Sequence, residues 1–194
     1  NMLTSMGAKI EGAGNETIII EGVTNLTGTE FDIPADRIEA GTYLAAAAVT
    51  KGNITIEGIN PTRLMKVIDK LKIAGAMINY TSNSISLNMN KEFPNPVNIT
   101  TAPFPDFPTD MQAQFSVLNA ISSGDSIVYE TVFENRFMHI LELNRMGCNI
   151  QVKGNRAYIK GVESLYGAEV MATDLRASAS LILAGLCAKG ETVV

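Results

Sequence analysis

The chain has 194 residues, of which 46% are hydrophobic and 18% are charged, with a net charge of −5. This composition is typical of a soluble globular domain, and the acidic balance argues against a nucleic-acid partner, because phosphate backbones bind basic surfaces. The apolar runs are far shorter than the roughly 20 residues that span a bilayer, so we expect no membrane segment. Cys148 and Cys187 lie in apolar segments without metal-ligand spacing, which predicts buried free thiols, no metal site and a cytoplasmic protein.

Along the chain, a first recurring pattern is the end of a helix followed by glycine and a β-hairpin. Gly7, Gly75 and Gly147 each follow a helical run and suit the left-handed position that ends a helix. Turns at Asn83 and Gly154 are expected to join alternating strands into hairpins. The predicted hairpin strands cover residues 77–80, 84–89, 149–153 and 157–160.

A second pattern alternates with the first: a strand, a polar turn ending in aspartate, a helix and a further strand. The spacing from Asp36, Asp110 and Asp174 to the glycine after each helix is nearly constant, as in repeated supersecondary units. The strands before the aspartates are expected over residues 30–33, 97–101 and 168–171. The helices are expected to run to residues 50, 122 and 188, and the following strands over residues 53–56, 125–128 and 191–194.

These helices are apolar on much of their surface, whereas the hairpin strands alternate between apolar and polar residues. Helices of the first kind are buried, and strands of the second kind have one face in water. We therefore predict an inside-out α/β fold of about three repeats, with buried helices and outer sheets. Neither a Gly-x-Gly-x-x-Gly motif nor a phosphate-binding loop is present in the sequence.

The three aspartates differ in what they are expected to do. An aspartate before a helix usually caps backbone N–H groups, and this is our interpretation of Asp36. Asp174 fits a cap or a charged site equally well, because Arg176 follows it in the first helical turn, where a cation suits phosphate or carboxylate binding. Asp110 follows the proline-rich loop 101–109, and an acid on a rigid loop can accept a proton from a substrate hydroxyl.

The segment 130–139 is the other candidate. Glu134, Asn135 and Arg136 lie between Phe133 and Phe137, and this arrangement fits a ligand-lining loop and a solvated helix start about equally. The single histidine, which ends this segment, is expected to be packed against a helix and to have no catalytic role.

Three motifs resemble a known family. They cover residues 107–115, 130–139 and 172–180, which read FPTDMQAQF, ETVFENRFMH and ATDLRASAS. In these motifs, and along essentially the whole chain, the sequence resembles the UDP-N-acetylglucosamine enolpyruvyl transferases. The resemblance implies an inside-out α/β barrel and an enzyme of peptidoglycan synthesis, which serves cell-wall growth, cell shape and division. It implies transfer of the enolpyruvyl group of phosphoenolpyruvate to the 3-hydroxyl of UDP-N-acetylglucosamine, by addition and elimination, with release of phosphate and without a cofactor.

The resemblance also implies roles for residues of the motifs. Asp110 would take the 3-hydroxyl proton, with Thr109 beside it. Val132 would contact the sugar nucleotide through its backbone, with Phe133 nearby. The remaining substrate-binding residues would line a cleft: Arg136, Asp174, Leu175 and Arg176. Of these, Arg176 would bind the phosphate or carboxylate charge of a substrate.

Finally, the resemblance implies an enzyme of two domains of which this chain is a fragment. Residues 1–33 would be the tail of the other domain, which carries the catalytic cysteine loop, and residues 34–194 a truncated inside-out domain. The partner would be the missing half of the polypeptide, and the fragment alone would be inactive. Two alternatives stay open: a non-catalytic repeat module that binds a sugar nucleotide, and a shikimate-type enolpyruvyl transferase.

Overall fold

The computed structural model describes residues 1–172 and 174–194, which form two compact units. Thr173, in the third motif, lies outside the described residues. The first unit, Asn1–Pro34, contains a short helix and an antiparallel pair of strands: α1 (Met2–Ser5), β1 (Lys9–Glu11) and β2 (Ile19–Glu21). The second unit, Ala35–Val194, contains the remaining described elements and every candidate site residue.

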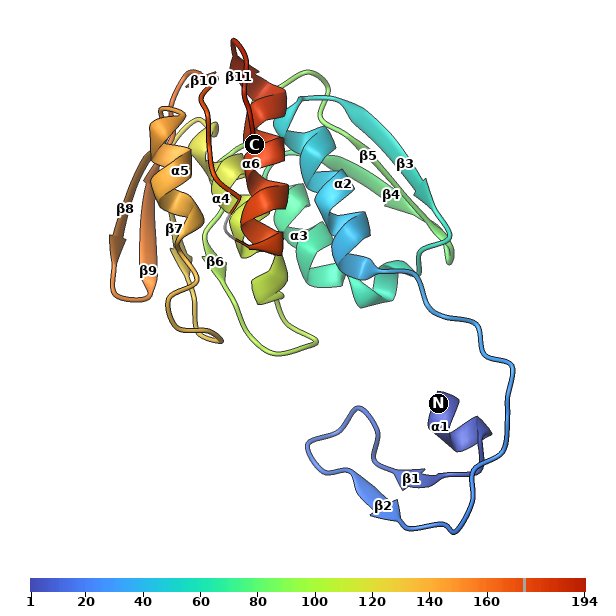
Figure 1. The fold of residues 1–194 in the computed structure, drawn as a ribbon. Coiled ribbons are helices and arrows are strands. Elements are labelled where there is room, and N and C mark those ends of the chain that lie inside the picture. Colours follow the sequence, from blue (N-terminus) through green and yellow to red (C-terminus); the bar gives the residue numbers. More distant parts are fainter. Residues whose placement is uncertain (173) are drawn as a thin grey trace. The chain divides into compact units, whose positions relative to one another are not determined.

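Helices form the interior of the second unit, between two sheets (Figure 1). They are α2 (Arg37–Val49), α3 (Met65–Ile73), α4 (Gln112–Ala120), α5 (His139–Arg145) and α6 (Leu175–Cys187), with 3-10 turns η1 (Pro61–Arg63) and η2 (Thr109–Met111). The helices α2, α4 and α6 pack against one another, and all nine residues of α4 are buried. The prediction of buried helices is confirmed for α4, whereas α2 and α6 each keep one exposed face, at Tyr43 and at Ile182.

The sheets lie outside the helices and are open. One has the order β3-β5-β4, with β3 (Asn53–Glu57), β4 (Met77–Tyr80) and β5 (Ser84–Asn88) all antiparallel. The other has the order β6-β7-β9-β8, with β6 (Ile99–Thr100), β7 (Asp125–Tyr129), β8 (Asn149–Lys153) and β9 (Arg156–Lys160). In β5 and β9 every second residue is buried, so these strands present one face to the helices and one to water.

The ends of the helices follow from the residues found there. The carboxylate of Asp36 accepts hydrogen bonds from two backbone N–H groups at the start of α2, and Asp174 does the same for α6. Gly75 and Gly147 follow α3 and α5 with φ values of 101° and 93°, which a residue with a Cβ rarely adopts. The caps and stops expected at these four positions are confirmed.

Two polar side chains of α4 bind specific partners inside the core. Asn119 of α4 accepts from the N–H of Val97 and donates to its carbonyl oxygen, both across 2.9 Å, and so substitutes for a neighbouring strand. The amide of Gln114 donates to the hydroxyl of Thr42 on α2 across 3.0 Å. Because an unpaired polar group in a core costs stability, these bonds also fix how α4 lies against its neighbours.

Three predicted strands are wrong. Residues 30–33 are exposed and pair with no strand among the described residues. Residues 168–171 and 191–194 run side by side, but they form a single parallel bridge, Glu169 to Val193. Regular pairing occurs just before each segment, where β10 (Leu165–Tyr166) pairs in parallel with β11 (Ala188–Lys189). Among the described residues, no helix has the length and apolarity required to cross a membrane.

Candidate active site

Asp110 lies in η2, after the proline-rich loop, and does not cap a helix as Asp36 and Asp174 do. Phe107 is buried and packs edge-on against Phe115 of α4, with ring centroids 4.9 Å apart. Asp110 was expected directly before a helix, but the extra turn η2 contains it and precedes α4. The carboxylate is thereby free of capping and available for other partners.

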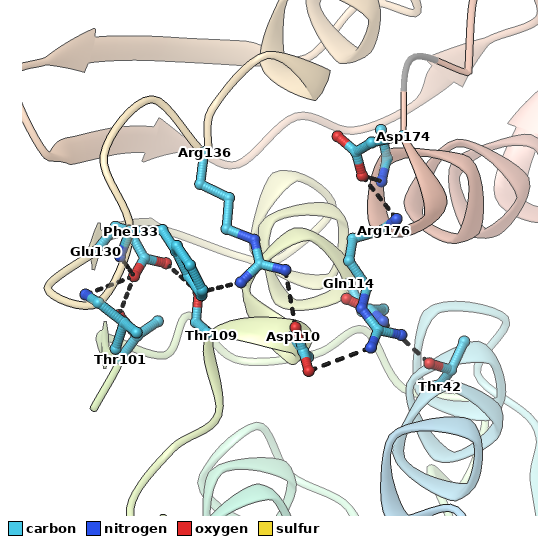
Figure 2. Close-up of polar contacts among 12 residues, drawn as sticks. Thr42, Thr101, Thr109, Asp110, Gln114, Glu130, Phe133, Arg136, Asp174 and Arg176 are labelled. Atoms are coloured by element: carbon cyan, nitrogen blue, oxygen red, sulfur yellow. Dashed lines mark hydrogen bonds and ion pairs between the residues drawn. The ribbon is translucent and has the colours of Figure 1, made fainter. Parts of the chain in front are cut away.

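Two arginines hold the Asp110 carboxylate from different sides (Figure 2). Nη2 of Arg136 lies 2.8 Å from Oδ1, and Nη2 of Arg176 lies 3.2 Å from Oδ2. The three side chains are only 23–32% exposed. Arg136 comes from the segment before α5 and Arg176 from the first turn of α6, so the fold brings together three residues from separate motifs.

This environment sets the charge of Asp110. Partial burial raises the pKa of the carboxyl, but the hydrogen bond from Arg136 and the positive charge of Arg176 outweigh it and hold the pKa below its usual value. Asp110 is therefore ionised at neutral pH. It is also a weak proton acceptor as long as both guanidinium groups contact it.

The depressed pKa makes stability depend on pH in a defined direction. A folded-state pKa below the ordinary 3.8 of Asp110 means that the unfolded chain takes up its proton first as the pH falls. The stabilisation is complete above about pH 5 and declines progressively below it. We expect Asp110→Asn to flatten the loss of unfolding free energy between about pH 5 and 3, measured by urea denaturation. An Asp125→Asn variant controls for the loss of an exposed acid. If the unfolding free energy fell equally steeply with pH in Asp110→Asn and in the unmodified protein, the lowered pKa could not be assigned to Asp110.

Arg136 makes two further contacts. The second guanidinium nitrogen of Arg136, Nη1, donates to the hydroxyl of Thr109 across 2.8 Å. The guanidinium carbon lies 4.8 Å from the ring centre of Phe133, a cation–π distance. The structure thus brings Thr109, Asp110, Phe133, Arg136 and Arg176 together. This arrangement offers two planar cations and one carboxylate, which suit an anionic ligand that also carries a hydroxyl.

The other expected site residues are arranged differently. The Asp174 carboxylate accepts from the backbone N–H of Arg176 at 2.7 Å and of Ala177 at 2.9 Å, so it acts as a helix cap and orients Arg176 indirectly. Leu175 is 74% exposed next to it. Val132 is partly exposed, and its N–H is already bonded to a buried carboxylate, that of Glu130.

Glu130 is the main feature that the sequence predictions missed. It is only 2% exposed, and its carboxylate accepts hydrogen bonds from four donors on the proline-rich loop and on the segment after β7. A signal was present, because Glu130 directly follows the alternating strand β7 and opens the second motif. A charge at the end of a strand is, however, usually solvated, so the sequence alone does not single it out.

His139 and Cys148 are buried, as expected for packed residues, whereas Cys187, which was also expected to be buried, is only partly buried. Burial lowers the pKa of His139 to about 4, so the ring is neutral at physiological pH. Burial likewise raises the pKa of Cys148 to about 12 and that of Cys187 to about 11, and neither forms a disulfide. Within the described ranges 1–172 and 174–194, no group of three or more His, Cys, Asp or Glu side chains is arranged to hold a metal ion.

Comparison with known proteins identifies the class. A family model described as EPSP synthase (3-phosphoshikimate 1-carboxyvinyltransferase) matches residues 1–194, and the chain belongs to this family. A curated relative from Hydrogenovibrio crunogenus, named UDP-N-acetylglucosamine 1-carboxyvinyltransferase, is 58% identical over 194 residues. The match covers 100% of this chain and 46% of the relative, so the chain spans about half the length of the curated relative.

Solved structures agree with the fold. The enolpyruvyl transferase NikO from Streptomyces tendae superposes with a TM-score of 0.82 and 28% identity, over 94% of this chain and 44% of NikO. EPSP synthase from Acinetobacter baumannii shares the fold, with a TM-score of 0.67 and 23% identity over 97% of this chain and 47% of that protein. The predicted enolpyruvyl-transferase fold is therefore confirmed, and so is the resemblance of the motifs.

Proposed function

We propose that this chain is the half of a two-domain enolpyruvyl transferase that supplies the general base. The substrates are phosphoenolpyruvate and UDP-N-acetylglucosamine, and the reaction is the first committed step of peptidoglycan synthesis. The domain assignments, 1–33 to the other domain and 34–194 to the inside-out domain, belong to this proposal. The observation that carries it is the ionised Asp110 carboxylate held between Arg136 and Arg176. The 58% identity to a UDP-N-acetylglucosamine 1-carboxyvinyltransferase supports the choice of acceptor.

In the proposed reaction, the 3-hydroxyl oxygen of the sugar attacks C2 of phosphoenolpyruvate while C3 gains a proton from the other domain. Asp110 accepts the hydroxyl proton, with Thr109 beside it. Loss of phosphate from the tetrahedral intermediate, with loss of a proton from C3, restores the double bond. Val132 and Phe133 contact the sugar nucleotide in this scheme, and Leu175 and Asp174 flank the arginines.

The two arginines link substrate binding to the proton affinity of Asp110. Phosphoenolpyruvate carries carboxylate and phosphate charge, both of which guanidinium groups bind well. When either arginine turns to the substrate, its ion pair with Asp110 weakens, and the pKa of Asp110 rises toward a value at which the group can accept a proton. Proton transfer would thus become favourable only after the anionic substrate is bound.

The test uses the full-length polypeptide that contains this chain. We expect phosphate release from phosphoenolpyruvate when UDP-N-acetylglucosamine is present and none with shikimate 3-phosphate. Rates with both acceptors, measured by a phosphate assay, decide between the two kinds of transferase. Binding of the sugar nucleotide without phosphate release from either acceptor would favour a non-catalytic sugar-binding module instead. Residues 1–194 alone are expected to release no phosphate.

The proposed substrates indicate where the enzyme is located and which partners it has. Both are small cytoplasmic metabolites, and the reduced thiols Cys148 and Cys187 support a cytoplasmic location. The net charge of −5 supports the absence of a nucleic-acid partner. The chemistry as proposed uses no cofactor or metal ion, and its remaining partner is the other half of the same polypeptide.

A further inference from the structure

Glu130 is a buried acid that joins two parts of the site. It directly follows β7 and is 2% exposed. Its Oε1 accepts from the hydroxyl of Thr101 at 2.7 Å and from the backbone N–H groups of Val132 at 2.9 Å and Phe133 at 3.1 Å. Its Oε2 accepts from the hydroxyl of Thr109 at 2.8 Å. Figure 2 shows this carboxylate beside Thr101, Thr109 and Phe133, on the far side of Thr109 from Asp110.

The direction of each hydrogen bond is fixed by chemistry. A guanidinium group only donates, so the Thr109 hydroxyl must accept from Arg136. The single proton of that hydroxyl then points to Glu130. A directed chain therefore runs from Arg136 through Thr109 to Glu130, and the same arginine donates its other nitrogen to Asp110.

The two sets of partners belong to different segments. Thr101 and Thr109 are the two ends of the proline-rich loop, and Val132 and Phe133 follow β7. A carboxylate that bonds to both segments restrains the position of one against the other. Groups of a reaction site lose much of their effect when they shift by about 1 Å, so such a restraint bears directly on rate.

We propose that Glu130 is a positioning residue, which holds the loop of Asp110 and the turn of Val132 and Phe133 in one geometry for the transfer reaction. This inference rests on the function proposed above. Glu130 is assigned no contact with either substrate. It acts on the acceptor through the two backbone N–H groups that it fixes, and on Asp110 through Thr109 and Arg136.

Glu130→Gln tests this role with almost no change in shape. The amide oxygen can keep the Oε1 position, but its NH₂ group then faces the Thr109 hydroxyl, which already accepts from Arg136. The proton of that hydroxyl loses its acceptor. The charge-assisted bond from Thr109 is thereby replaced by a neutral bond of the opposite direction, which weakens the link between the loop and the turn at one point while the volume of the buried side chain is retained.

In the full-length protein, Glu130→Gln is expected to lower kcat about 10-fold or more and to raise KM for UDP-N-acetylglucosamine more than KM for phosphoenolpyruvate. A merely structural role would reduce the active fraction and leave both KM values unchanged. Because Glu130 and Thr109 act through one hydrogen bond, the effects of Glu130→Gln and Thr109→Ala on kcat should be less than additive in the double variant. Glu163→Gln, at an exposed position, serves as the matched control and should keep the original constants.

Unchanged kcat and KM values in Glu130→Gln, or full additivity with Thr109→Ala, would overturn the inference. Hydrogen exchange gives a readout that does not depend on activity: the N–H groups of Val132 and Phe133 should exchange faster in Glu130→Gln than in the original protein. If the unmodified protein releases no phosphate with any acceptor, the proposed function fails. Unchanged exchange at both N–H groups would then reject the role of Glu130 as well.

Discussion

Replacing Asp110 with asparagine in the full-length polypeptide is expected to slow phosphate release by a factor on the order of 100 or more. Asparagine has nearly the same shape, but its amide cannot accept the proton of the 3-hydroxyl. General-base catalysis contributes about 100- to 10,000-fold in enzymes, which sets the size of the loss. The amide also has no charge, so Arg136 and Arg176 lose the carboxylate that lies between them.

The first repeat contains a matched control residue for this experiment, Asp36. Asp36 is at the equivalent position before α2, where it caps the helix, and asparagine is an equally good cap. Asp36→Asn should therefore leave the rate and the unfolding free energy close to those of the original protein. A rate for Asp110→Asn within about twofold of the control would remove Asp110 from the base role, since one general base contributes far more than that.

The largest effect on stability is expected for Phe115→Ala, which should lower the free energy of unfolding by about 3–5 kcal/mol. Phe115 is completely buried on α4, the helix that packs against both α2 and α6. The ring of Phe115 packs against that of Phe107, which belongs to the proline-rich loop. Removing the ring leaves a cavity in the middle of the helices. Urea denaturation of the original and variant proteins measures the difference.

Phe93→Ala is the control for the loss of a phenylalanine ring. Its side chain is 51% exposed and lies under the ammonium group of Lys51, so we expect a loss of about 1 kcal/mol or less. The ring of Phe107 should also become more mobile in Phe115→Ala, because it loses its packing partner. Equal losses in the two variants would mean that α4 is not the centre of the core.

The local structure of the repeats could be predicted because short sequence signals determine it. Gly75 and Gly147 end helices through a backbone conformation that favours glycine, and Asp36 and Asp174 begin helices through their own carboxylates. Strands need a partner, and a single sequence does not reveal where the partner lies. Residues 30–33 pair with no strand among the described residues, and residues 168–171 and 191–194 share only one bridge, so the strands predicted there are wrong, whereas the hairpin strands after Gly75 and Gly147 are predicted correctly.

The site was predictable in its members but not in its contacts. The motifs pointed to Thr109, Asp110, Arg136 and Arg176, and the structure brings these residues together. Their pairing could not be inferred, because the partners lie on separate repeats and local spacing carries no information about such distances. Glu130 was missed for a related reason: its burial depends on the proline-rich loop folding over the end of β7.

The pairing across repeats also has a consequence for how the protein folds. The bond between Gln114 and Thr42 joins residues 72 positions apart, and that between Arg136 and Asp110 joins residues 26 positions apart. Contacts of such high sequence separation form late, because long chain segments must be closed first. The charged centre should therefore be absent from partly folded states. A ligand that binds there would select the completed native structure, and its binding energy would be added to the stability of the whole domain.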